Sequence, residues 1–136
     1  MNRILIDTMY ISALLTDEDD SYHELAQVID DEKIAGLVSV VTLTELVTIL
    51  GIKIYKEKIN QLITSKLVFI DINQMIAVRA GELHLKYGLP TADSLIAATG
   101  LIENVGHIVT DDSHFIATKN LIKPIDLKKA LKLASK

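Results

Sequence analysis

Short apolar runs without helical period recur along the chain, and the segments between them have helical periodicity. The runs cover residues 3–6, 36–41, 67–70 and 106–110. They are too short for helices and mostly aliphatic, as is typical of strands buried on both faces of a parallel sheet. Alternation with helices favours parallel pairing, because consecutive parallel strands need a crossover connection. The pattern predicts an α/β fold: a three-layer α/β/α sandwich around a central parallel sheet.

Apolar stripes at helical spacing indicate the helices that connect these strands. Gly51 and Gly88 mark the ends of two of them, since glycine readily adopts the backbone conformation that follows a helix. Pro124 favours an edge position for a short strand at residues 121–125, because proline cannot donate a ladder hydrogen bond. The predicted helices cover residues 8–15, 21–31, 42–50, 55–63, 73–87 and 91–103.

The chain has the size of one domain. Its 136 residues, of which 49% are hydrophobic, are enough to bury a substantial core. We expect residues 1–126 to form the body of the domain and residues 127–136 to be a lysine-rich C-terminal helix or tail of it.

Composition argues against several classes of protein. The chain has no cysteine, so a disulfide framework and a thiolate metal site are excluded, and a reducing cytoplasm fits. Asp7 interrupts the apolar start and no cleavage site follows, so we expect no signal peptide. No apolar stretch approaches the roughly 18 residues of a membrane span. We therefore expect a cytoplasmic protein without membrane contact.

Acidic residues stand near the ends of the predicted strands. Asp7 directly follows the first strand, and Asp111 and Asp112 directly follow the fourth. Glu45 lies within one helical turn of the second strand, and Asp93 opens the helix that leads into the fourth. Ligands of open parallel sheets bind outside the carboxyl ends of the strands. We expect these acids to meet at that edge.

Each acid also has a purely structural explanation. Asp7 could cap the helix that follows it. Thr42 and Glu45 have the spacing of a capping box, in which each side chain satisfies the other's backbone donor. Thr91 could cap a helix whose first turn holds Asp93, and the last two acids could shape a turn. Each acid could therefore have a structural role of its own instead of a function shared with the others.

The joint placement of the acids favours a metal site. Converging carboxylates repel one another and raise one another's pKa unless a cation neutralises them. Oxygen ligands alone suit Mg²⁺, with Mn²⁺ as the alternative. His114 lies near the acids in sequence and could shuttle a proton, although a surface turn explains a single histidine more simply.

Charge is unevenly distributed along the chain. The net charge is −4, and acidic residues gather at positions 17–20 and 30–32. The C-terminal part is rich in lysine, with its densest group at Lys128, Lys129 and Lys132. Such a group could contact phosphates, but a solvated helix face is the simpler expectation.

Four motifs follow one another over nearly the whole chain. They are Ile4-Leu5-Ile6-Asp7-Thr8, Thr42-Leu43-Thr44-Glu45-Leu46, Leu89-Pro90-Thr91-Ala92-Asp93-Ser94-Leu95-Ile96-Ala97-Ala98-Thr99 and Ile108-Val109-Thr110-Asp111-Asp112-Ser113-His114-Phe115. In this order and spacing they resemble the PIN domain family, and most closely the small VapC-type toxins of prokaryotic toxin–antitoxin systems. The third motif is the most specific of the four.

The resemblance implies a PIN-like fold and assigns the catalytic, metal-binding acids. The first three correspond to Asp7, Glu45 and Asp93. The fourth stands two positions after the residue that closes the strand, which is Asp112 in this chain. Asp111 occupies a position that is commonly basic or neutral in the family, so it could share or replace the role of Asp112.

Such a site performs metal-assisted hydrolysis of phosphodiester bonds. Thr8 and Thr110 stand beside the acids and could orient their carboxylates by hydrogen bonds. The resemblance implies a Mg²⁺-dependent endoribonuclease acting on RNA, the toxin of a toxin–antitoxin pair. It also implies a homodimer and a small antitoxin protein that covers the active-site groove.

Three alternatives remain open at this point. A PIN-like nuclease could process RNA outside a toxin–antitoxin system. A catalytically silent PIN-like module could bind RNA or protein, although no acid is missing here. A response-regulator receiver is also an α/β fold with clustered acids, but it needs paired acids early in the chain. Asp7 has no such neighbour, and Asp71 in mid-chain fits poorly without one.

Overall fold

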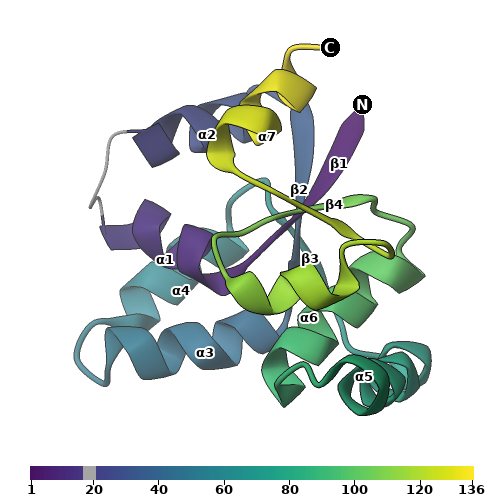
Figure 1. The fold of residues 1–136 in the computed structure, drawn as a ribbon. Coiled ribbons are helices and arrows are strands. Elements are labelled where there is room, and N and C mark those ends of the chain that lie inside the picture. The colour runs from purple at the N-terminus through teal and green to yellow at the C-terminus, as the bar shows by residue number, and fades with distance from the viewer. Residues whose placement is uncertain (17–20) are drawn as a thin grey trace.

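The computed structural model describes residues 1–16 and 21–136 (Figure 1). Within these ranges the strands form one sheet in the order β3-β2-β1-β4-β5, and every neighbouring pair is parallel. The acidic positions 17–20 lie outside the described residues. The strands are β1 (Asn2–Ile6), β2 (Ile34–Ser39), β3 (Val68–Ile70), β4 (His107–Val109) and β5 (Lys123–Ile125).

Helices cover both faces of the sheet, as the alternation of elements predicts (Figure 1). Successive residues of β1 point to opposite faces. Ile4 and Ile6 join the core beneath α1, α2 and α7, whereas Leu5 joins the core beneath α5 and α6. The helices are α1 (Thr8–Thr16), α2 (Ser21–Asp30), α3 (Val41–Leu50), α4 (Tyr55–Ile63), α5 (Gln74–Tyr87), α6 (Thr91–Ile102), the 3₁₀ helix η1 (Ser113–Thr118) and α7 (Leu127–Ala134).

The chain order of the strands reverses at β1. The strands β2 and β3 lie on one side of it, and β4 and β5 on the other. Ile6 pairs with Val109, so β1 and β4 end side by side, and the amide of Asp7 donates to the carbonyl of Val109 over 3.2 Å. A reversal of this kind leaves a crevice at the carboxyl edge of the sheet. The acids that follow β1 and β4 open onto it.

Two of the predicted helix caps are wrong. The strand expected to reach Val41 ends at Ser39, and α3 begins at Val41 after Val40, which makes no side-chain cap. Thr42 therefore lies inside the helix and forms no capping box. Pro90, not Thr91, precedes α6, again without a side-chain cap. At the start of α3 the amide of Val41 donates instead to the hydroxyl of Ser39 at 3.3 Å.

The C-terminal segment packs on the body of the fold. β5 is an edge strand, in accordance with Pro124. Helix α7 follows it and buries Ala130 and Ala134 in the same core as β1. Across the two described ranges, no helix is both long and apolar enough to cross a membrane.

Candidate metal centre

The four predicted acids lie close enough together to interact electrostatically. The charges of Asp93 and Asp112 both raise the pKa of Asp7. Those of Asp112 and Glu45 both raise the pKa of Asp93. Because such effects fade within several ångströms in a hydrated site, the four side chains share one region at the carboxyl edge of the sheet.

Asp7 is the most buried of the four and is held by two donors. Its side chain is 4% exposed, and its carboxylate accepts from the amide of Thr8 at 2.8 Å and from the hydroxyl of Thr110 at 2.6 Å. Burial raises its pKa from 3.8 to about 6, although both hydrogen bonds oppose the shift. Asp7 is thus preorganised as a ligand, and a nearby positive charge would lower its raised pKa.

A chain of hydroxyl groups positions Glu45. The hydroxyl of Thr8 donates to the Glu45 carboxylate at 2.6 Å, and it lies 2.9 Å from the hydroxyl of Thr42. Since Thr8 has a single hydroxyl proton, Thr42 is the donor in the second bond. Thr8 thus makes a hydrogen bond to one of the acids, of the kind through which it could orient a carboxylate. Sequence reasoning missed Thr42, because its spacing to Glu45 is also that of a capping box.

Asp93, Asp112 and His114 form a tighter group, with one ligand atom from each within 4.8 Å of the others. The His114 Nδ1 atom lies 2.9 Å from the Asp93 carboxylate and 3.0 Å from that of Asp112. The hydrogen bond with Asp93, followed by the charge of Asp112, raises the pKa of His114. His114 is exposed and follows the turn after β4, as expected of a surface histidine, and it also contacts both carboxylates. The spacing of His114 two residues after Asp112 could have indicated the contact.

The structure separates the two adjacent aspartates at the end of β4. The Asp112 amide donates to the Thr110 hydroxyl at 2.9 Å. The Asp112 carboxylate caps η1 by accepting from the amide of His114. Asp111 accepts instead from the Tyr10 hydroxyl at 3.1 Å. Burial, assisted by the charge of Asp111, raises the pKa of Tyr10. Asp112 therefore joins the other acids, whereas Asp111 lies against Tyr10.

The donor set fits a hard divalent cation. Carboxylate oxygens from Asp7, Glu45, Asp93 and Asp112 are the ligands that Mg²⁺ prefers. An imidazole at His114 is also acceptable to Mn²⁺. Burial and the charge of Asp112 raise the pKa of Asp93, although its bond to His114 opposes this. A bound cation would relieve the repulsion among these groups. Such a site can polarise a phosphate and activate water.

Comparison with known proteins bears on the family and the fold. The PIN domain model matches residues 4–121. A chain of VapBC2 from Rickettsia felis, crystallised with a DNA fragment from their promoter, superposes with a TM-score of 0.73 at 21% identity, covering 91% of this chain and 98% of that one. A chain of a toxin–antitoxin complex from Klebsiella pneumoniae gives a TM-score of 0.70 at 22% identity, covering 91% and 97%.

A chain of DNA-bound VapBC from Salmonella typhimurium gives a TM-score of 0.71 at 16% identity, covering 93% of this chain and 99% of that one. At such identities the likeness establishes the fold. No curated protein sequence matches the chain significantly. The family model spans most of the chain and contains all four motifs that predicted the resemblance. The chain belongs to the PIN domain family.

Proposed function

We propose that this protein is a metal-dependent endoribonuclease that hydrolyses RNA phosphodiester bonds. The observation that carries the proposal is the meeting of Asp7, Glu45, Asp93 and Asp112 at the carboxyl edge of a PIN-domain sheet. The raised pKa values of Asp7 and Asp93 mean that the ionised carboxylates are costly in the metal-free protein, so a function that binds a cation best explains the cluster.

The four acids hold Mg²⁺ or Mn²⁺ in this proposal. The ion supplies positive charge against the scissile phosphate and acidifies a water molecule. Thr110 and the amide of Thr8 fix the Asp7 carboxylate, while the Thr42–Thr8 chain fixes Glu45. His114 stands where it can hold a proton beside Asp93 and Asp112. Carboxylates fixed in this way would hold the ion in one position relative to a bound phosphate.

The biological setting is the finer part of the proposal. The structural neighbours are VapC- and FitB-type toxins of toxin–antitoxin complexes. On this basis we propose that the protein is a toxin that forms a homodimer and is restrained by a small antitoxin. A PIN nuclease that processes RNA without an antitoxin is the first alternative. A silent module that binds RNA or protein is the second.

Cleavage of RNA by the purified protein tests the enzyme. Wild type should cut a mixed RNA substrate in Mg²⁺ and lose this activity in EDTA, and Asp93→Asn should fall by orders of magnitude. Calorimetry with Mn²⁺ provides a readout besides activity, because Asp93→Asn should also weaken binding of the ion. Undiminished cleavage in EDTA would refute the metal nuclease. RNA binding without cleavage by wild type would favour the silent module.

The toxin assignment needs a cellular test. Brief induction should arrest growth, and sequencing of new RNA 5′ ends should reveal cuts that Asp93→Asn does not make. Co-expression of a small open reading frame adjacent to the gene should restore growth if it encodes the antitoxin. Specific cuts without growth arrest would favour RNA processing outside a toxin–antitoxin system.

A further inference from the structure

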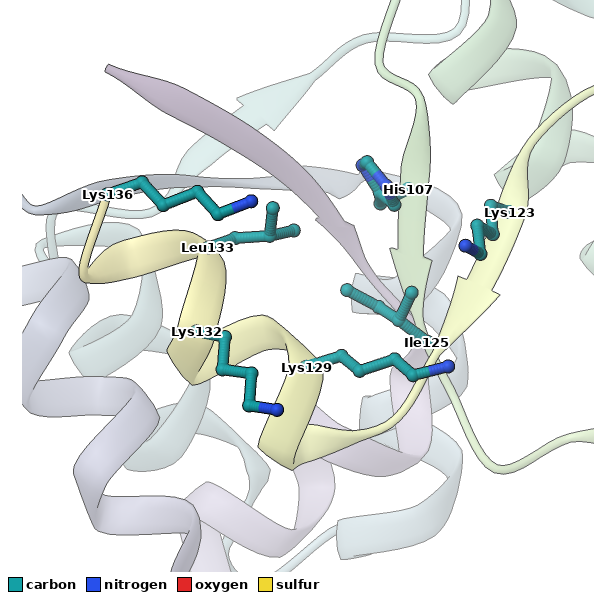
Figure 2. A pocket seen from close by; sticks show the side chains of 7 residues that line it. All are labelled: His107, Lys123, Ile125, Lys129, Lys132, Leu133 and Lys136. Atoms are coloured by element: carbon teal, nitrogen blue, oxygen red, sulfur yellow. The ribbon is translucent and has the colours of Figure 1, made fainter.

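A basic pocket of about 240 Å³ lies between α7 and the strands β4 and β5 (Figure 2). Lys129, Lys132 and Lys136 contribute to it from the C-terminal segment, and Lys123 from β5. His107 completes the polar lining, and the other two lining side chains are aliphatic. Figure 2 shows Lys129 and Lys136 extending from the α7 side toward the strands. We call this site the lysine pocket.

Positive charge in the lysine pocket is not neutralised by a neighbouring acid. No acidic side chain lines the pocket. Within residues 1–16 and 21–136, none of the four lysines forms an ion pair. Burial, followed by the charges of Lys123 and Lys136, lowers the pKa of His107. The repulsion among these cations would be relieved by a bound anion.

The lysine pocket runs along β4 and β5 beneath α7, from their first residues to Ile125, the last residue of β5, and its His107 end is remote from the metal centre. His107 and Lys123 are the first residues of β4 and β5, whereas Asp112 follows the carboxyl end of β4. The stretch from His107 to Thr110 spans about 10 Å of extended chain. Charges this far apart are largely screened at physiological ionic strength. The carboxylates are therefore largely screened from the His107 end of the pocket.

Helix α7 holds its lysines in place. Asp126 caps the helix by accepting from the Lys129 amide at 2.9 Å, and the buried Ala130 and Ala134 anchor it to the core. Lys129 and Lys132 are three residues apart and lie on one side of α7, and Lys136 follows the end of the helix. Lys128 belongs to the same helix but does not line the pocket. The sequence alone had grouped it with Lys129 and Lys132.

We propose that the lysine pocket binds a phosphate group of an RNA strand. A phosphate accepts several hydrogen bonds at once and suits ammonium donors better than a single carboxylate does. Figure 2 shows the ammonium groups spread around the pocket, so one phosphate would contact a subset of them. The volume is below the range of about 300–1,000 Å³ that is usual for whole small ligands, so it suits one phosphate and part of its sugar. With a net charge of −4, the protein needs such a local cluster to attract RNA.

That the bound phosphate belongs to RNA rests on the proposed function, whereas the binding of phosphate itself does not. Inorganic phosphate tests the latter on the full chain in EDTA, at constant ionic strength with chloride as the reference anion. The imidazole NMR signals of His107 should shift saturably and its pKa should rise, because a bound anion favours the charged ring. The signals of His114, beside the carboxylates, should stay unchanged. Equal response of all histidines, or none, would overturn the assignment.

Measurements of RNA affinity test whether the pocket binds RNA. They use Asp93→Asn protein in Ca²⁺ so that the RNA stays intact. Lys129→Gln with Lys132→Gln should weaken binding at least tenfold for all sequences. The slope of log affinity against log salt should fall by about 1.4, the value for two fewer contacts with single-stranded RNA. Lys128→Gln with Lys86→Gln removes the same charge outside the pocket and should change neither quantity.

Each outcome decides a different point. Equal losses of RNA affinity in both double variants would mean that RNA is attracted by the general charge of the protein, and would overturn the assignment of the pocket. A response to inorganic phosphate with unchanged RNA affinity would assign the site to free phosphate compounds and overturn the RNA assignment. If wild type fails to cleave RNA but the pocket variants still lose affinity, the nuclease proposal fails and this inference stands.

Discussion

At the scale of single residues, hydrogen bonds decide which acids can act together. Thr110 illustrates this, because its hydroxyl donates to Asp7 and accepts from the amide of Asp112. One side chain thereby connects the carboxyl ends of β1 and β4. Asp111 has no share in this arrangement and binds Tyr10 instead. The roles of neighbouring residues therefore differ more than their identical side chains suggest.

The first prediction compares the two aspartates after β4. Asp112→Asn should lower RNA cleavage by at least 100-fold, because its carboxylate lies in the group with Asp93 and His114. Asp111→Asn should lower it less than threefold, since this side chain contacts Tyr10. Single-turnover cleavage rates in Mg²⁺ measure both. The reverse order would move the fourth acid to Asp111, and two mild losses would leave the metal with three acids.

The second prediction concerns the hydroxyl chain to Glu45. Thr8→Val removes the donor to Glu45 with little change in volume, and such losses beside a metal ligand typically cost 10–100-fold in activity. Thr42→Val, one bond further away, should cost less. In a Glu45→Gln background, Thr8→Val should have little further effect on the cleavage rate. Additive losses would show that Thr8 acts independently of Glu45.

The third prediction is a pH dependence of stability in the metal-free protein. The folded state raises the pKa of Asp7 from 3.8 to about 6, so it holds this proton more tightly than the unfolded chain. The resulting stability is complete below about pH 4 and is lost as the pH rises through 6. Asp7→Asn cannot lose a proton and keeps both neighbouring hydroxyl and amide contacts within reach.

Urea denaturation in EDTA should therefore show an advantage of Asp7→Asn over wild type that grows by about 1–3 kcal/mol between pH 4 and pH 7. Saturating Mg²⁺ should reduce this advantage, because the ion stabilises the ionised wild type. An advantage that is constant with pH would contradict the raised pKa. Wild type and Asp7→Glu, both ionisable, provide the matched comparison.

At the scale of helices and strands, the helix ends differ in whether a local side-chain or glycine signal marks them. Asn73 caps α5 by accepting from the Ile76 amide at 2.9 Å, and Gly88 ends the helix with φ of 70° in the left-handed region. The sequence predicted a helix over residues 73–87 that ends at Gly88, but not the cap at Asn73. Helices α3 and α6 begin within one residue of their predicted starts, although neither has a side-chain N-cap. For these two helices the apolar pattern, and not a cap, marked the start.

The fourth prediction separates a real cap from an apparent one. Asn73→Ala should lower the free energy of unfolding by about 1 kcal/mol, the usual cost of losing an N-cap. Thr91→Ala, at the position that resembled a cap, should change it by less than about 0.5 kcal/mol, since both residues are exposed and Thr91 caps nothing. Urea denaturation midpoints measure both variants. Equal losses would show that Thr91 does cap α6 in solution.

At the scale of the whole molecule, exposed apolar surface indicates where a second copy could pack. The stripe expected on residues 55–63 is largely used within the chain, because Leu62 is buried and Ile59 packs against the same core. Helix α5 differs: Met75, Val78 and Leu85 are 65%, 66% and 85% exposed. This face of α5 is the better candidate for the proposed homodimer.

The fifth prediction tests this face by light scattering at micromolar concentration. Wild type should have about twice the 15.0 kDa mass of the chain, and Val78→Glu should return it to the monomer mass, because a buried unpaired charge disfavours the interface. Ile52→Glu, at an apolar position that is 84% exposed outside α5, is the control and should remain dimeric. A monomeric wild type would rule out the dimer at this concentration. Dissociation by Ile52→Glu alone would place the interface elsewhere.

The sequence by itself determined the alternation of strands and helices and the acids that follow the strands. Both are local properties, set by apolar periodicity and by position along the chain. From them the parallel sheet and its acidic edge could be predicted, because parallel strands place their carboxyl ends together. The edge strand at Pro124 was predictable for a similar reason, because the missing backbone N–H of proline is a property of that single residue.

Only the tertiary structure decided which side chains face one another. The turn after β4 directs Asp112 and His114 to Asp93 and leaves Asp111 against Tyr10, a choice made by loop rotation. The packing of α3 against α1 turns Thr42 from an apparent cap into a donor for Thr8. The lysine pocket arises because α7 folds back beside β4 and β5. These contacts join residues far apart in the chain, where no local pattern can record them.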